Sequence, residues 1–537
     1  MSELSQSTKK LIDRYKSWYQ STQSREGVLT VHVDEVASAV AAFYEKMRGI
    51  VDWREEHLMR KAAMERMLKR RMLLAKSADE ATAEGLVMEL IRGGHFPNDK
   101  VPEVKIKEVQ RLIDKYLFIF ETSPQAPKEN QKVRLYDWLL SIAACELEEI
   151  LSPSIRERAL IDYMTEFMEE KIKLREGVLV VGGMTEEEKN TQVYIAVQKA
   201  LLKLDYPLIS YSLLKKRIPQ WQTLARDDDL LQEIGRKIYS IWDKTAKDLR
   251  HPLADKFYKI CERYDTPYLI MGDIISEDPT GIEKKIEVPE ELEAKINWAY
   301  QKRLAKLKSK IRRAAIYVTL SIFITKISLA LLIETPIDIK ITHSFSYITM
   351  AINIITPPLL MLLMILSVRP PGKDNLQRVI MEVMKIAYSN ERKEIYPIDK
   401  TKKRGFMMNL AIILFYTVTY VVSFGLIIYG LTLLHFGALS IVIFLIFVSL
   451  ISFAGIKLRD RARELEVSAK KDSFLVGLIE LFSIPIIRMG KWLSSQWAQY
   501  NVIAISLNFL VDWPFQRFIE FLEQWRDFMK EKKEEIH

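Results

Sequence analysis

The chain has 537 residues, of which 49% are hydrophobic and 28% charged, and its formal net charge is +9. Two cysteines exclude a disulfide framework and a CxxC metal pair, so we expect a reducing compartment. Much of the positive charge flanks long apolar runs, which favours an anionic membrane surface over nucleic acid as the partner.

Residues 1–313 are predicted to form a helical cytoplasmic head, because amphipathic helical periodicity dominates them. A Pro-containing polar stretch at 123–130 is predicted to be a linker. It separates a first helical subdomain, 1–122, from a second, 131–313, which ends in a basic juxtamembrane segment. The N-terminus lacks the apolar core of a secretory signal, so the head is expected to stay in the compartment where it is made.

A short repeated sequence predicts a small amount of β-structure in the head. REGVL occurs at Arg25 and again at Arg175, and β-branched residues follow in both places. We interpret 28–33 and 178–181 as two short strands that pair with each other. The helix that follows the second strand begins with TEEE, in which Thr185 and Glu188 predict a capping box.

Three stretches of the head have the residue types of chemical sites without their spacing. VVGGMT at 180–185 lacks the signatures of a P-loop and of a Rossmann turn, which leaves a strand-to-helix turn. Glu55, Glu56 and His57 lack a second histidine at ligand spacing, so a solvated helix face is their more ordinary role. The aspartates of 227–229 are more typical of helix capping than of cation binding. We therefore predict no catalytic residue, cofactor or metal site.

Four apolar runs are each long enough to span a bilayer as a helix, which takes about 20 residues. They predict a transmembrane bundle over 314–456, with spans at about 314–333, 346–368, 408–434 and 436–456.

Charge between the spans predicts their orientation. The segments before the first span, between the second and third, and after the fourth are rich in Lys and Arg, whereas the two other loops carry one lysine or none. The positive-inside rule then places both termini in the cytoplasm, provided that nothing after residue 472 crosses. The basic segment before the first span is also a candidate contact for anionic lipid headgroups, through Lys302, Arg303, Lys306, Lys308, Lys310, Arg312 and Arg313.

Lys326 lies at mid-depth in the first predicted span. A charge at this depth faces the bundle interior and finds a partner. Glu334 is two turns further on, too far to pair directly along one helix, so we expect Glu480 to be the partner. Together with Asn353, these residues form a candidate intramembrane polar network. A structural clamp and a coupling or ion site are both open readings of it.

Pro357 and Pro358 predict a kink in the second span, because proline removes helical hydrogen bonds. Asn353, one turn earlier, is the expected partner for a carbonyl that the prolines leave free. Such a kink either lines a pathway or serves packing.

The region 457–537 follows the bundle. An apolar stretch of fourteen residues, 474–487, is short for a span and predicts a re-entrant or interfacial segment. Residues 513–537 predict an amphipathic C-terminal helix, which lies on the membrane, docks on the head or self-associates.

Two stretches, 44–71 and 352–371, resemble an uncharacterised group of multi-pass membrane proteins from small-genome, candidate-phylum bacteria. The resemblance covers most of the chain. It implies a bacterial inner membrane and carries no activity, cofactor or site residue.

The predicted fold is therefore mostly α: a helical head with at most a small two-stranded sheet, a four-helix transmembrane bundle and an amphipathic C-terminal helix. The predicted function is a non-enzymatic scaffold or envelope-organising protein of the bacterial inner membrane. The alternative is a small transporter or channel subunit that uses the intramembrane polar residues. The expected partners are the lipid bilayer and a protein, or a second copy, bound through the head or the C-terminal helix.

Overall fold

The structure is a computed structural model, and its described residues form two compact units that are treated separately below. The head unit comprises the described residues of Glu3–Glu283, Ser389–Lys400 and Asn508–His537, and the membrane unit those of Lys284–Tyr388 and Thr401–Leu507. The structure describes residues 3–23, 29–33, 53–74, 80–124, 129–174, 184–337, 339, 346–368, 370–388, 395–398, 405–467, 474–499 and 525. Within them the chain is mostly helical, as the sequence predicts.

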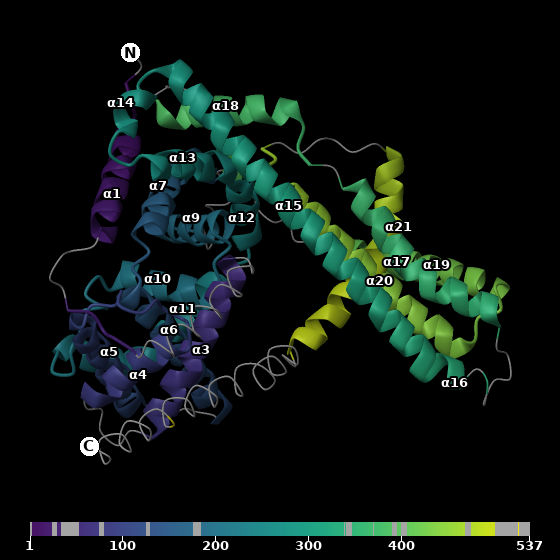
Figure 1. Ribbon diagram of the computed structural model, residues 1–537, viewed down its shortest axis with the longest axis horizontal. Coiled ribbons are helices and arrows are strands. Elements are labelled where there is room, and N and C mark those ends of the chain that lie inside the picture. The colour runs from purple at the N-terminus through teal and green to yellow at the C-terminus, as the bar shows by residue number, and fades with distance from the viewer. Residues whose placement is uncertain are drawn as a thin grey trace, which may run out of the picture. The chain divides into compact units, whose positions relative to one another are not determined.

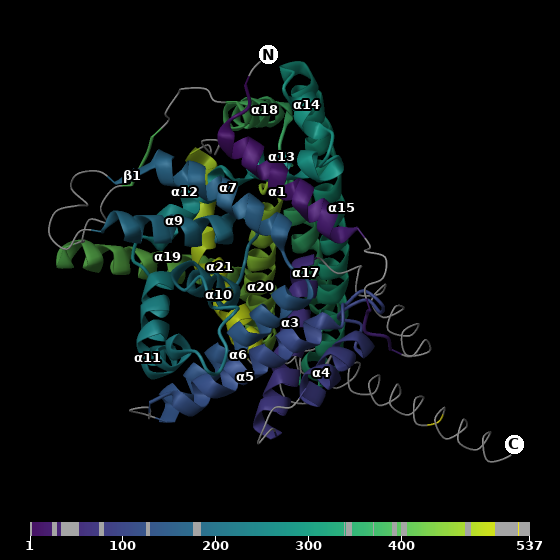
Figure 2. The same ribbon diagram turned by 90° about the vertical axis from the view of Figure 1, so that its left-hand side faces the viewer.

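One group of helices in the head unit shares a hydrophobic cluster (Figures 1 and 2). The members are α3 (Trp53–Leu74), α4 (Glu80–Arg92), α5 (Val104–Thr122), α6 (Glu129–Leu151), α10 (Tyr206–Arg217) and α11 (Asp229–Leu249). Helices α5 and α6 lie on either side of the predicted linker, and Tyr116 and Leu139 from them are both buried in the cluster. The linker region therefore does not separate two cores; its residues 125–128 lie outside the described part.

The other helices of the head unit pack around α7 and α9 (Figure 2). They are α1 (Gln6–Thr22), α7 (Ile155–Lys171), α9 (Glu186–Leu201), α12 (Ala254–Arg263) and α13 (Asp265–Glu277). The predicted capping box of α9 is confirmed: Glu188 N donates to Thr185 Oγ1 at 3.1 Å, and Thr185 N donates to Glu188 Oε2 at 2.8 Å. The short helix α14 (Ile282–Ile286) contains the boundary between the units.

The sheet that the structure describes is formed by other residues than those predicted. Strand β1 (Ile172–Leu174) pairs in parallel with β2 (Tyr396–Ile398), which comes from the basic segment between the second and third apolar helices. Of the predicted strands, 178–181 lies outside the described residues. In the other, Thr30 forms a single antiparallel bridge with Pro102.

The membrane unit contains four helices that are long and apolar enough to cross a membrane, within the residues described. The first runs over Pro289–Ile337, as α15 (Pro289–Leu329), the π-helical turn η1 (Ala330–Glu334) and α16 (Thr335–Ile337). The others are α17 (Tyr347–Ser367), α19 (Phe406–Leu433) and α20 (Ala438–Ala462). These helices match the four predicted spans. The basic segment and the first span form one continuous helix, α15 (Figure 1).

Helix α17 contacts both α15 and α20, whereas α19 contacts mainly α21 (Phe474–Gln499). The helix α18 (Lys373–Ala387) packs against α15. Helix α21 has 26 residues and continues well past the predicted end at 487. The predicted amphipathic helix, 513–537, lies outside the described residues except for Trp525.

Candidate functional site

A buried polar cluster lies where the first and second apolar helices meet. Lys326 Nζ is 2.5 Å from Glu334 Oε1. The other carboxylate oxygen of Glu334 accepts a hydrogen bond from Asn353 Nδ2. The three residues are 0%, 3% and 4% exposed in the described structure. Burial of a charge without a partner is costly, so each member of this cluster depends on the others.

The expectation that Glu334 lies too far along the helix to pair with Lys326 is wrong. In an α-helix of 3.6 residues per turn, positions eight apart differ by about 80° around the axis. A π-helical turn accommodates one additional residue, and the helix makes such a turn at Ala330–Glu334. Glu334 therefore stands where the seventh residue after Lys326 would stand in a regular helix, on the same face.

The predicted pairing of Lys326 with Glu480 stays a prediction. The side chain of Glu480 lies outside the described residues, although its backbone belongs to α21. Helix α21 nevertheless packs closely on the apolar helices. Ser423 Oγ of α19 donates to the carbonyl of Phe482 at 2.8 Å, and a Cβ at Gly490 would overlap the carbonyl group of Ser449 in α20. Glycine is thus required where the two backbones approach.

The pocket that the described residues form beside the polar cluster is small. A pocket of about 20 Å³ lies beside Glu334 and Asn353. This volume suffices for about one water molecule. Asn353 Oδ1 has no hydrogen-bond partner among the described residues, so a water molecule there would have an acceptor. The pocket is lined by Ala330, Glu334, Thr335, Ser346, Thr349, Met350, Asn353, His435, Gly437 and Ser440.

The proline pair lies inside α17, which is helical from Tyr347 to Ser367. Pro357 is buried, and Pro358 lines a separate groove described below. Asn353 does not serve the freed carbonyls as expected, because its amide group donates to Glu334. Thr356 Oγ1, immediately before the prolines, donates to the carbonyl of Ile352 at 2.6 Å, which is not one of the carbonyls that the prolines leave free. The kink itself remains a prediction.

The basic residues predicted to contact lipid headgroups all lie on α15. Lys302, Lys306, Lys308, Arg312 and Arg313 are exposed, whereas Arg303 and Lys310 are half-buried. Lys302 Nζ lies 4.6 Å from the ring centre of Trp298 on the same helix. Contact of these residues with lipid remains a prediction.

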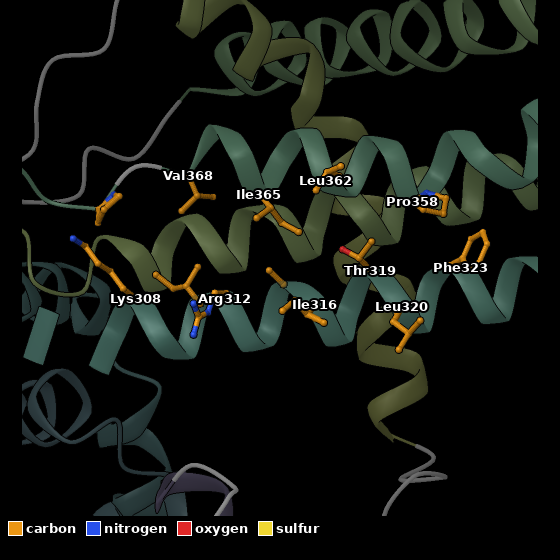
Figure 3. A pocket seen from close by; sticks show the side chains of 13 residues that line it. Lys308, Arg312, Ile316, Thr319, Leu320, Phe323, Pro358, Leu362, Ile365 and Val368 are labelled. Carbon is orange, nitrogen blue, oxygen red and sulfur yellow. The ribbon is translucent and has the colours of Figure 1, made fainter. Parts of the chain in front are cut away.

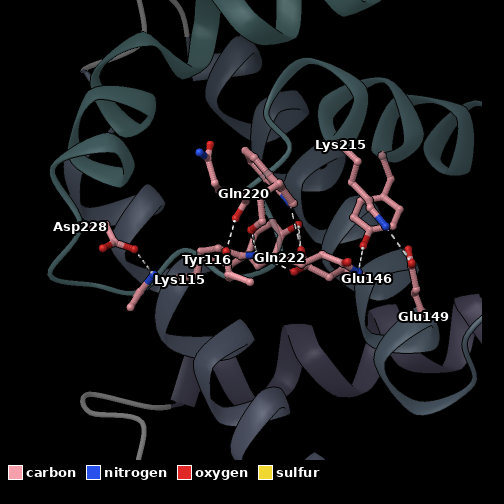
Figure 4. A network of polar contacts seen from close by, with 12 residues as sticks. Lys115, Tyr116, Glu146, Glu149, Lys215, Gln220, Gln222 and Asp228 are labelled. Atoms are coloured by element: carbon pink, nitrogen blue, oxygen red, sulfur yellow. Dashed lines mark hydrogen bonds and ion pairs between the residues drawn. The ribbon is translucent and has the colours of Figure 1, made fainter.

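Sequence reasoning missed a second buried ion pair, in the head unit (Figure 4). Lys115 Nζ lies 2.5 Å from Glu146 Oε1 and donates to the carbonyl of Trp221 at 2.8 Å. The other carboxylate oxygen of Glu146 accepts from Tyr116 Oη at 2.9 Å and from Trp221 Nε1 at 3.0 Å. Burial lowers the pKa of Lys115, and burial together with the nearby Glu146 raises the pKa of Tyr116. Lys115, Tyr116 and Glu146 lie within helices α5 and α6, and Trp221 lies in the turn between α10 and α11, so only tertiary packing reveals the network.

A buried asparagine in the membrane unit was also missed. Asn375 of α18 donates through Nδ2 to Tyr300 Oη at 3.1 Å and to the carbonyl of Leu465 at 2.6 Å. Its Oδ1 accepts from the backbone N–H of Val467 at 2.9 Å. One side chain thus ties α18 to α15 and to the segment after α20.

Three stretches have the residue types of chemical sites without their spacing, and the structure describes them only in part. Asp228 is the N-cap residue of α11, but its carboxylate accepts from the N–H of Ala225 rather than from the helix. The side chains of Glu55, Glu56 and His57 lie outside the described residues, as does most of 180–185. Within the described part of the chain, no group of three His, Cys, Asp or Glu side chains could hold a metal ion.

Comparison with known proteins adds no functional assignment: no family model, no curated protein and no solved structure matches this chain. The four long apolar helices indicate a membrane protein.

Proposed function

We propose that this protein is a non-enzymatic membrane scaffold, in which the four apolar helices anchor a large helical head. The observation that carries the proposal is the closed polar cluster. Lys326, Glu334 and Asn353 bind one another, and the pocket beside them has room for about one water molecule. A transport pathway needs a larger hydrated cavity. A clamp that fixes the packing of two helices needs only polar groups that bind one another.

The head unit supports the same interpretation. Its buried charges are also engaged with one another: Lys115, Tyr116 and Trp221 all bind Glu146 within the hydrophobic cluster. Groups used in catalysis must be reachable by a substrate. A fully buried, internally satisfied network is suited to holding helices together.

The chain connections fit a scaffold that positions its head. The head unit receives β2 from the segment between α18 and α19 of the membrane unit. Within the head, the ring of Tyr396 in this strand stacks on Tyr264 at a centroid distance of 4.5 Å. The chain thus enters the head unit again between the second and third apolar helices. This connection between the units is additional to the one at α14.

The proposed location is a bacterial inner membrane with a cytoplasmic head. The support is the alternation of basic and non-basic segments around the apolar helices, together with the resemblance of 44–71 and 352–371. Under the proposal, anionic headgroups contact the basic part of α15, and a protein partner or a second copy binds the head or the C-terminal segment. The side on which the C-terminus lies depends on whether α21 crosses.

The scaffold is tested with the full chain reconstituted in liposomes and in a planar bilayer. We expect ion conductance and proton flux no greater than in lipid alone, and head residues in sealed vesicles accessible to protease from one side only. A conductance that Glu334→Gln abolishes would overturn the scaffold. The matched control for that variant is Glu290→Gln, which removes a carboxylate near the start of α15, far along the helix from the cluster.

A small transporter or channel subunit is the second candidate. One observation favours it: Asn353 Oδ1 is buried without a described partner beside a pocket with polar walls. For transport, this pocket would have to widen and join a continuous path. The flux measurement above distinguishes the two functions directly.

A further inference from the structure

A second, larger depression in the membrane unit is a groove between α15 and α17 (Figure 3). Its volume is about 570 Å³, within the range of small-molecule sites. Its walls are mostly apolar: Ile316, Leu320 and Phe323 come from α15, and Pro358, Leu362 and Ile365 come from α17. This groove does not include the Lys326 cluster.

The sequence explains why the helices leave a gap here. On α15 the small side chains of Ala315 and Thr319 line the groove, between larger residues on either side. On α17 the compact ring of Pro358 also lines the groove, and Figure 3 shows it near Phe323 of α15. The result is an apolar groove that the two helices alone do not fill.

One end of the groove is positively charged. Lys308 and Arg312 are four residues apart, so they lie on the same face of α15, and both line the groove. Both are exposed, and neither makes an ion pair or hydrogen bond with any residue that the structure describes. Since no described residue neutralises them, the two charges can bind an anion.

The wall also contains one unsatisfied polar atom. Thr319 Oγ1 is buried and has no hydrogen-bond partner within the described residues, and Figure 3 shows it between the two helices. A helical threonine commonly bonds to a carbonyl of the preceding turn, as Thr356 does. Thr319 thus offers a hydrogen bond to an ester or hydroxyl group in the groove.

The length of the groove matches one acyl chain. From Arg312 to Phe323 the helix rises by about 16 Å, at 1.5 Å per residue. Half of a bilayer hydrocarbon core measures about 15 Å. A molecule with an anionic head at Arg312 and an apolar chain along Ile316 and Leu320 would end near the middle of the membrane.

We propose that this groove binds an anionic phospholipid, with the phosphate at Lys308 and Arg312 and one acyl chain between α15 and α17. A soluble anion would gain nothing from the apolar walls, and an uncharged lipid would leave the two cations unpaired. The inference rests on the membrane placement in the proposed function, and not on the scaffold role.

The test is a titration of the delipidated full chain in detergent, followed by native mass spectrometry. The probes are dioleoyl phosphatidylglycerol, dioleoyl phosphatidylcholine, glycerophosphoglycerol (the head alone) and dioleoylglycerol (the chains alone). We expect phosphatidylglycerol to bind more tightly than each of the others. Equal binding of phosphatidylcholine, or binding of the head alone with equal affinity, would overturn the proposal.

The charge variant is Lys308→Gln with Arg312→Gln. Because each cation near a membrane surface contributes about 1 kcal/mol, roughly a fivefold change, losing both should weaken phosphatidylglycerol binding roughly thirtyfold. The matched control is Lys306→Gln with Arg313→Gln, which removes the same charge from exposed residues of α15 that do not line the groove. Equal weakening by the two pairs would reduce the site to a diffuse electrostatic attraction and contradict the proposal.

The groove variant is Ile316→Trp, which fills the space from an exposed position without changing charge. Tyr317→Trp, at the exposed neighbouring position outside the groove, is its control. Circular dichroism of each variant checks that the helices persist. Only Ile316→Trp should reduce binding. If both or neither reduce it, the groove is not the site, whatever the flux measurements show about the scaffold.

Discussion

Lys326 and Glu334 stand eight residues apart on one helical segment, and their charged atoms meet at 2.5 Å. The contact depends on the π-helical turn at Ala330–Glu334 and is completed by Asn353 from the neighbouring helix. The π-helical turn thus brings a carboxylate to the ammonium of Lys326, which without a partner would be a costly charge in an apolar span.

The ion pair predicts non-additive stability effects. Lys326→Met leaves Glu334 buried without its cation, so the free energy of unfolding should fall by about 3–5 kcal/mol. Lys326→Met combined with Glu334→Leu removes both charges and should recover much of that loss. Unfolding of the full chain in mixed detergent measures both effects. Lys306→Met, at an exposed position on α15 outside the groove, is the control; two independent, additive losses would refute the coupling.

The π-helical turn predicts an asymmetric response to changes in chain length. Deletion of Leu332, an exposed residue of the turn, converts it to a regular helix in which Glu334 is the seventh residue after Lys326. The pair stays on one face, so the free energy of unfolding should change by less than about 1 kcal/mol. Insertion of alanine after Leu332 rotates Glu334 by about 100° and should cost about 3 kcal/mol. Equal losses would mean that the turn does not set the register.

In the membrane unit, the sequence predicts the four apolar helices better than the contacts of individual side chains. Long apolar runs predict the existence of all four helices, because bilayer thickness and hydropathy dictate their apolar length, although the first helix begins at Pro289, well before the predicted 314. The partner of Lys326 could not be predicted, because a π-helical turn has no strong sequence signature and depends on neighbouring helices. The threefold bonding of Asn375 joins segments far apart in the sequence and leaves no local pattern either.

In the head, too, the sequence predicts local features better than contacts between distant segments. The capping box of Thr185 and Glu188 is a local motif, and it is confirmed. The three-residue strands β1 and β2 are too short to show an alternating pattern, and their pairing joins distant segments. The polar composition of 123–130 predicts a linker, whereas the hydrophobic cluster includes α5 and α6 on either side of it.

The head network predicts a large effect of one carboxylate. Glu146→Leu leaves the ammonium of Lys115 buried and takes the acceptor from Tyr116 and Trp221. The expected loss is about 3–5 kcal/mol in the free energy of unfolding by urea. Adding Lys115→Met should restore part of it. Glu233→Leu, at an exposed position of α11 where the carboxylate pairs only with the exposed Lys237 among the described residues, is the control and should change stability little.

The tyrosines of the head unit predict a loss of stability at alkaline pH. Burial raises the pKa of Tyr194 to about 12 and also raises those of Tyr15, Tyr116, Tyr163 and Tyr211. An unfolded tyrosine loses its proton near pH 10. Above about pH 10 the unfolded state therefore binds fewer protons than the folded state, and the free energy of unfolding falls as the pH rises. Below pH 10 these groups add no pH dependence.

Tyrosinate absorbance of the full chain in detergent measures this behaviour, with circular dichroism recorded at each pH. The buried tyrosines should titrate late or together with loss of helix, and Tyr194→Phe should remove a late component. Titration of every tyrosine near pH 10, with the helical signal unchanged, would show that they are not buried.

The most direct test of the closed cluster is the accessibility of a cysteine placed in its small pocket. Ser440 is buried in that pocket, whereas Ser346 is an exposed residue of its wall. The native cysteines give little background, because Cys145 and Cys261 are buried and burial raises the pKa of both thiols. A membrane-impermeant thiol reagent is added to sealed vesicles that contain either Ser440→Cys or Ser346→Cys, from each side in turn. We predict that Ser346→Cys reacts from one side and Ser440→Cys from neither, as a closed clamp requires. Reaction of Ser440→Cys at a rate comparable to that of Ser346→Cys would reveal a hydrated path through the bundle and contradict the scaffold.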